Sequence, residues 1–110
     1  MVLSEGFKQA LLMDGTVQNI IPTVAVLAYY SAYLYVHNMV SGDTIEFTIY
    51  VNDPQSSTER IYDQFTVSGA QTNVAVFIPN VPTDSFRVTA EQTAQGAGGY
   101  KTINVVRYDS

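Results

Sequence analysis

The clearest pattern of apolar and polar positions lies in residues 42–51. Along this stretch apolar side chains alternate with Thr, Glu and Tyr, and they fall at Ile45, Phe47, Ile49 and Val51. A period of two places the two sets on opposite faces of a strand. Turn-forming residues bound the stretch, with Gly42-Asp43 before it and Asn52-Asp53-Pro54 after it. The pattern predicts a central strand of an antiparallel sheet, with one dry face and one wetter face.

Similar short patterns recur at roughly ten-residue spacing and predict about eight strands in all. The other extended segments are 16–21, 23–30, 31–37, 59–67, 74–78, 85–92 and 100–108. Residues 52–58 form a polar loop, which predicts a hairpin between the strands on either side of it. Asp14-Gly15 predicts a second hairpin turn. We therefore expect a single all-β domain over residues 1–110, an antiparallel β-sandwich with jelly-roll or Greek-key topology.

Prolines and apolar runs refine these predictions. Pro22 is expected to end the strand over 16–21, and Pro79 to end the strand over 74–78, because proline cannot continue a central ladder. The run Val74–Ile78 is apolar on both parities, which predicts a strand buried on both faces.

The first segment, residues 5–13, fits two patterns. Phe7 and Leu11 match a helical stripe as well as one parity of a strand. Nine residues before a turn, in an otherwise all-β chain, favour the strand. Residues 1–13 are thus expected to form an extra strand or an N-terminal arm that pairs with a neighbour by strand addition.

Composition excludes several function classes. Apolar residues make up 46% of the 110 residues, so the chain can bury a core. The net charge of −5 leaves no basic stripe for nucleic acid and disfavours an anionic membrane surface. There are no cysteines, and the first residues lack the features of a signal peptide. We expect a protein that stays in the cytoplasm or leaves the cell by another route, such as release in a virion.

Candidate chemistry is sparse. The one histidine, His37, has no nucleophile or orienting acid placed by a motif, and one histidine without cysteine cannot build a zinc site. Asp43 and Glu46 have opposite parity and cannot act as a carboxylate pair, whereas Glu91 and Asp63 could meet only through an unknown strand pairing. The loop aspartates are expected to form turns rather than a calcium site; they are Asp14, Asp43, Asp53, Asp63 and Asp84. We therefore predict no catalytic residue, no metal, no cofactor and no enzymatic activity.

Eight tyrosines are the more informative feature. Tyr33, Tyr35 and His37 share one parity, opposite Leu34 and Val36. The tyrosines can belong to the core and a half-buried pleat, to a subunit interface, or to a stacking platform for sugars. The candidate interface residues are Phe7, Leu11, Tyr29, Tyr30, Tyr33 and Tyr35.

Three stretches in order resemble a group of small all-β virion proteins of tailed phages and archaeal viruses. They are Asp14-Gly15-Thr16-Val17-Gln18, the strand over 42–51, and the segment over 86–94 (Phe-Arg-Val-Thr-Ala-Glu-Gln-Thr-Ala). Between the last two lie Tyr62-Asp63, Ser68–Gln71 and Phe77-Ile78-Pro79. The loops depart from the group, since residues 52–58 lack a lysine and residues 95–99 are rich in glycine.

The resemblance implies a jelly-roll-like structural component of a particle surface, such as a decoration, turret or fibre-type protein. It also implies two partners, further copies of the chain and a capsid or tail scaffold protein, with a trimer suited to capsid threefold positions. Two alternatives remain. One is a carbohydrate-binding module that uses Tyr33 and Tyr35, and the other is a surface-layer or filament subunit, which would need an export signal.

Overall fold

In residues 3–110, eight antiparallel strands form two four-stranded sheets. The structure is a computed structural model that describes residues 3–110. The strands are β1 (Ser4–Leu12), β2 (Gln18–Val24), β3 (Ala28–Tyr35), β4 (Thr44–Asp53), β5 (Thr58–Ser68), β6 (Ala75–Thr83), β7 (Phe86–Ala94) and β8 (Thr102–Asp109). The described residues contain no helix that is long and apolar enough to cross a membrane.

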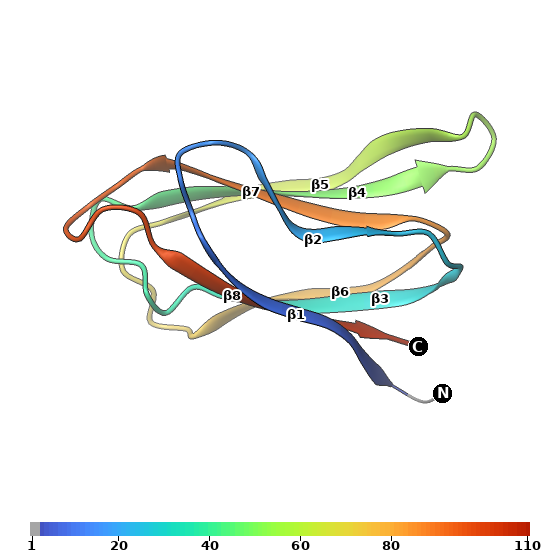
Figure 1. Ribbon diagram of the computed structural model, residues 1–110, viewed down its shortest axis with the longest axis horizontal. Coiled ribbons are helices and arrows are strands. Elements are labelled where there is room, and N and C mark those ends of the chain that lie inside the picture. The colour runs from blue at the N-terminus through green and yellow to red at the C-terminus, as the bar shows by residue number, and fades with distance from the viewer. Residues whose placement is uncertain (1–2) are drawn as a thin grey trace.

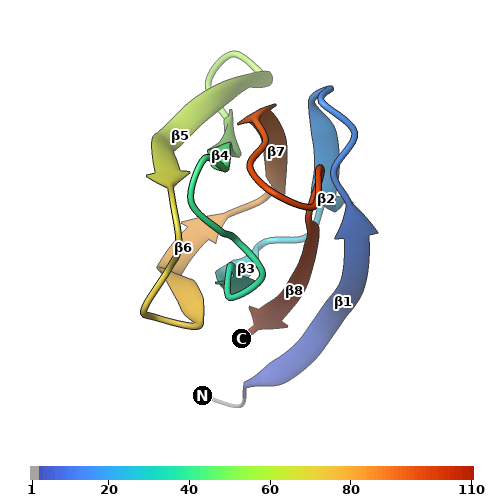
Figure 2. The same ribbon diagram turned by 90° about the vertical axis from the view of Figure 1, so that its left-hand side faces the viewer.

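The two sheets stack as the layers of a sandwich (Figure 1). One sheet has the order β1-β8-β3-β6 and the other the order β2-β7-β4-β5. In the end view the second sheet lies above the first, with β5 over β6 at one side and β2 over β1 at the other (Figure 2). Among consecutive strands only β4 and β5 pair within a sheet, and the remaining connections join strands that are not ladder neighbours. This is jelly-roll topology, and the predicted all-β sandwich is confirmed.

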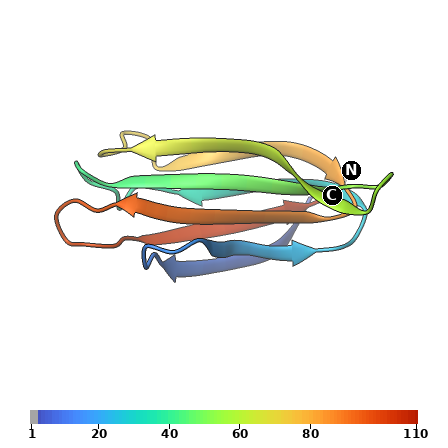
Figure 3. The same ribbon diagram turned by 90° about the horizontal axis from the view of Figure 1, so that it is seen from above.

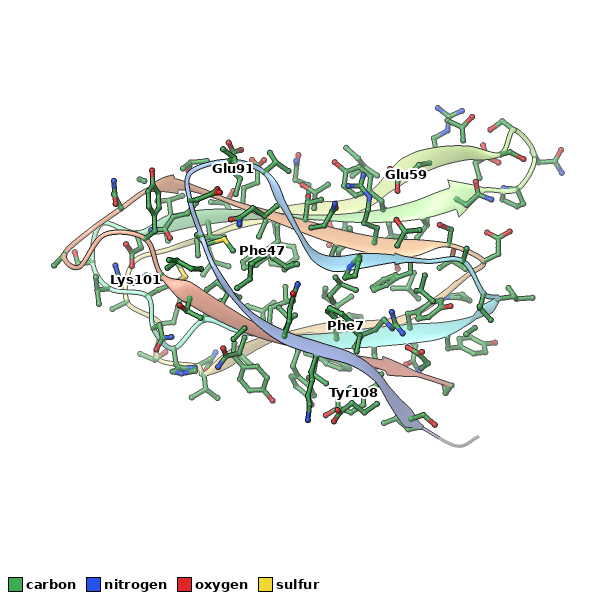
Figure 4. The ribbon with its side chains drawn as sticks, in the orientation of Figure 1. Phe7, Phe47, Glu59, Glu91, Lys101 and Tyr108 are labelled. Atoms are coloured by element: carbon green, nitrogen blue, oxygen red, sulfur yellow. The ribbon has the colours of Figure 1, made fainter. Side chains whose placement is uncertain are left out.

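Residues 42–51 supply the strand that the pattern predicts. β4 lies between β5 and β7 and pairs with both (Figure 3). Its inward residues Ile45, Phe47 and Ile49 are buried, and Phe47 lies between the layers (Figure 4). Apolar residues from both sheets meet there in one continuous core. The central-strand prediction and the β4–β5 hairpin are confirmed.

The proline predictions are wrong for a shared reason. β6 continues through Pro79 and Pro82, and β2 continues through Pro22. Both strands lie at sheet edges, where a residue without an N–H removes no bond to an outer neighbour, and both contain register shifts. The prediction of a strand buried on both faces over Val74–Ile78 is also wrong, because Val74, just before edge strand β6, and Phe77 on that strand are exposed.

The Asp14-Gly15 turn does not close a hairpin. β1 pairs with β8 and β2 pairs with β7, so the turn carries the chain from one sheet to the other. Asp14 Oδ1 accepts hydrogen bonds from Thr16 N (3.0 Å) and Thr16 Oγ1 (2.6 Å), while Gly15 takes the positive φ of 84°. The dipeptide therefore signals a tight turn without specifying which strands it connects.

Two further segments bear on the sequence predictions. Residues 25–27 form a connection between β2 and β3, whereas the sequence predicts extended chain over 23–30. Residues Ser4–Leu12 form β1, which is hydrogen-bonded to β8 of the same chain, so the helical alternative is wrong.

Candidate functional site

The outer face of the β1-β8-β3-β6 sheet carries an aromatic cluster. β3 alternates buried Tyr30, Ala32 and Leu34 with outward-facing tyrosines, as its period of two requires. Neighbouring strands add one aromatic residue each, from β6 and from β8. We call this surface the aromatic face; it consists of Tyr29, Tyr33, Tyr35, Phe77 and Tyr108.

Tyr33 is the centre of the cluster. Its ring centroid lies 5.0 Å from Phe77, 6.1 Å from Tyr35 and 6.3 Å from Tyr108. Strand register explains these contacts, because Tyr33 pairs directly with Phe77 on β6 and lies opposite Val106 on β8. The rings meet at interplanar angles of 36°, 40° and 89°, so they interlock and do not form one flat platform.

The cluster is open to solvent. Tyr29, Tyr33 and Phe77 keep 44%, 38% and 50% of their accessible surface. Tyr35 and Tyr108 are half-buried, and His37 continues the row with its ring 6.5 Å from Tyr35. Large aromatic groups gathered on one face of a small domain are typical of a contact surface rather than of scattered apolar exposure.

A shallow groove of about 490 Å³ runs beside the cluster over β8. Side chains of β1 and β8 line it, together with Tyr35 of β3. The lining residues are Glu5, Lys8, Gln9, Ala10, Tyr35, Asn104, Val105, Val106 and Tyr108. Tyr108 projects away from the sandwich on this side (Figure 4).

Charge on this face is balanced. Among the described residues of the sheet, Glu5 and Lys8 are the charged side chains that point outward, and they lie 3.4 Å apart. The whole chain carries a formal charge of −5. The remaining surface is therefore acidic, and this face is locally neutral.

The predicted interface residues separate into two groups. Tyr29, Tyr33 and Tyr35 lie together on the aromatic face. Tyr30 points into the core, where it stacks on Phe86 at 5.1 Å, and burial raises the pKa of its hydroxyl. Phe7 and Leu11 also point inward and pack against the core.

Sequence reasoning missed Phe77 and Tyr108. Phe77 lies in the apolar run that predicts a buried strand, and Tyr108 lies in the last strand of the chain. Only the pairing of β3 with both β6 and β8 brings these two residues to Tyr33. The usable signal is the parity that Tyr108 shares with the outward residues of β8.

Comparison with protein-family models, with curated proteins and with solved structures gives no match. The site is therefore described by its own geometry. In residues 3–110 no group of three His, Asp or Glu side chains is placed to hold a metal ion.

On the outer face of the other sheet, polar side chains of different strands bond to one another. Arg87 on β7 donates from Nε (3.0 Å) and Nη2 (2.6 Å) to the Glu59 carboxylate on β5. It also donates from Nη1 to Asn19 Oδ1 on β2 (2.8 Å), and its guanidinium lies 4.1 Å from the centre of the Tyr50 ring on β4. The hydrogen bond from Arg87 lowers the pKa of Glu59. One side chain thus connects all four strands of this sheet.

A buried polar network joins the loops at one end of the sandwich. Asp43, at the start of β4, is almost fully buried and accepts hydrogen bonds from Gly96 N (2.7 Å), Val40 N (2.8 Å) and Lys101 Nζ (3.2 Å). Burial by itself raises the pKa of Asp43, but these hydrogen bonds outweigh it and the pKa is lowered. A Cβ on Gly96 would collide with the Ser41 carbonyl oxygen, so this position requires glycine. Asp43 is therefore a structural carboxylate.

Proposed function

We propose that this chain is a non-enzymatic structural component of a viral particle that associates with further copies of itself and docks on a capsid or tail scaffold. The observation that carries the proposal is the exposed aromatic face on a jelly-roll sandwich. Jelly rolls are frequent in capsid domains, although the fold alone does not determine function. The ordered motifs over 14–18, 42–51 and 86–94 add the resemblance to virion proteins.

The aromatic face supports self-association because it exposes what an interface core normally buries. Tyrosine and phenylalanine are enriched in such cores, and charged residues are depleted there. Here Tyr33 and Phe77 are exposed with their rings in contact, while the charges of Glu5 and Lys8 lie on β1 and neutralise each other.

A separate apolar surface supports the second contact in the proposal, to a scaffold. The connection between β2 and β3 is Ala25-Val26-Leu27, and Leu27 keeps 78% of its accessible surface. Connections of this kind are usually built from polar residues, glycine or proline. An apolar connection at one end of the sandwich suits burial against another protein.

The proposal is tested by the molar mass of the purified chain. Light scattering after size-exclusion chromatography, combined with electron microscopy, should show a discrete oligomer. A monomer at all concentrations up to the millimolar range would contradict self-association.

Carbohydrate binding is a second candidate function, and the groove favours it. Tyr35 and Tyr108 offer ring faces beside the polar side chains of Asn104, Glu5 and Lys8, a combination that can stack on and hydrogen-bond a sugar. The interlocked angles around Tyr33 leave no continuous flat platform for a polysaccharide chain. Tyrosine fluorescence that changes during titration with an oligosaccharide would favour this function over assembly.

A further inference from the structure

The aromatic face has two halves of opposite shape. Tyr33 on β3 and Phe77 on β6 are exposed, with their rings in contact, and form a ridge along one side. The groove of about 490 Å³ lies over β8 and β1 on the other side. Ridge and groove therefore lie side by side on one sheet, the ridge on β3 and β6 and the groove on β8 and β1.

We propose that the aromatic face packs against the same face of a second copy, with the ridge of each copy in the groove of the other. The inference rests on the proposed function and names the surface that its self-association uses, in a two-fold dimer rather than the trimer that the resemblance implies. A two-fold axis parallel to the strands exchanges the two sides of the face, so each ridge meets a groove. A two-fold axis across the strands would set ridge against ridge and leave the grooves empty.

Charge favours a second copy of this chain at this face. Two acidic proteins of charge −5 repel each other, and the repulsion is weakest where the facing surfaces are neutral. The Glu5–Lys8 pair gives the aromatic face this neutrality. On the opposite sheet Glu46 lies directly across from Glu91, so apposing two copies there would bring four carboxylates together.

The available area is sufficient. Four strands spaced about 4.8 Å apart, each with about eight residues of about 3.3 Å, give a face of roughly 500 Å². Two such faces bury roughly 1,000 Å² in total, which reaches the lower limit for a specific interface. Tyr33, on the inner strand β3, would lie near the middle of the contact, where binding energy is usually concentrated.

Strand register defines which positions should meet. Phe77, Tyr33, Val106 and Lys8 form one row across the sheet. The proposed axis places Phe77 of one copy opposite Lys8 of the other, separated by the roughly 10 Å between packed sheets. Phe77 of one copy stays far from Phe77 of the other, because β6 and β1 are three strand spacings, about 14 Å, apart. Sheet twist rotates the two faces by about 30°, which a flexible linker tolerates.

The absence of native cysteine makes a cross-linking test clean. Phe77→Cys and Lys8→Cys chains are co-expressed, treated with a bismaleimide whose spacer is about 10 Å, the separation of packed sheets, and analysed by denaturing electrophoresis. We expect a dimer from the mixture and at most a trace from either variant alone. Ala75→Cys with Ala10→Cys, at the two ends of the next row, provides a second pair if one variant does not fold. Tyr62→Cys, on exposed strand β5, is the matched control and should not link.

Light scattering on the same samples distinguishes failure of this inference from failure of the proposed self-association. An oligomer that gives no link in either mixture would overturn this inference and leave self-association intact. A monomer would overturn both. A monomer whose tyrosine fluorescence responds to an oligosaccharide would assign the face to a sugar instead.

Discussion

The side chains on the outer faces of the two sheets make different kinds of contact. On the β2-β7-β4-β5 sheet, Arg87 reaches Glu59, Asn19 and Tyr50, so polar groups of four strands bond to one another. On the β1-β8-β3-β6 sheet, Tyr33 contacts three aromatic neighbours, and half of the Phe77 side chain remains in water. The Arg87 network of the first face is satisfied within one chain, whereas the second face gains by covering its aromatic surface.

Because of this difference, substitutions on the two faces can test stability and association separately. Substitutions on the polar face should change the free energy of unfolding and leave the oligomer intact. Substitutions on the aromatic face should change association and have a smaller effect on unfolding.

The largest effect on stability is expected in the interior, at Asp43. Asp43→Asn removes the charge that Lys101 and two backbone amides bind, which should cost about 3 kcal/mol in the free energy of unfolding. Because the pKa of Asp43 is lowered from 3.8, its contribution is present above that pH and is lost as the pH falls through the folded-state pKa. Urea unfolding at pH 7 and at pH 3 should show a smaller difference between variant and wild type at the lower pH. An equal difference at both values would assign the loss to shape rather than charge.

Association should respond next, at Tyr33. Tyr33→Ser removes the ring that contacts Phe77, Tyr35 and Tyr108, and the dimer should weaken at least 30-fold, about 2 kcal/mol for a central aromatic residue. Analytical ultracentrifugation measures this change. Tyr62→Ser is the matched control, since Tyr62 is 52% exposed on the other sheet, and its dissociation constant should match wild type. Equal weakening by both substitutions would remove the distinction between the faces.

A smaller change in stability is expected at Arg87. Arg87→Met keeps much of the apolar stem and removes the bonds to Glu59 and Asn19 and the contact with the Tyr50 ring. Because these groups are partly exposed, the loss should be about 1 kcal/mol in the free energy of unfolding. The molar mass should be unchanged, and dissociation of this variant would show that the polar face also takes part in assembly.

The smallest expected effect is an increase, not a decrease, in the free energy of unfolding. Glu91 lies directly across from Glu46 on the polar face, and like charges in this position are destabilising. Glu91→Gln should therefore raise the free energy of unfolding by about 0.2–0.5 kcal/mol at low salt. The gain should shrink in 1 M salt, and a gain independent of salt would not be electrostatic.

The sequence predicts the β-sandwich but not the order of the strands within its sheets. Alternation in residues 42–51 is a local property, so β4 and its buried face could be predicted. Position at a sheet edge depends on distant partners, which explains why the sequence alone predicts strand ends at the prolines of β2 and β6. Asp14-Gly15 likewise shows that the chain turns, without showing that it changes sheets.

In the candidate site, too, relations within one strand could be predicted, whereas relations between strands could not. The parity of β3 predicted that Tyr33 and Tyr35 share a face, because that relation lies within one strand. Phe77 and Tyr108 join them through pairing with β6 and β8, which local periodicity does not encode. Val74–Ile78 shows the resulting ambiguity: apolar residues on both parities fit a fully buried strand and equally an edge strand that exposes an apolar outer face.

The central claim is that the aromatic face is where copies of this chain meet. The most direct measurement is the molar mass of wild type and Phe77→Asp by light scattering over a range of concentrations, with unfolding curves for both. We predict an oligomeric wild type and a variant that is monomeric at the same concentrations, with an unfolding midpoint close to that of wild type. A Phe77→Asp chain that keeps the wild-type mass would contradict the account.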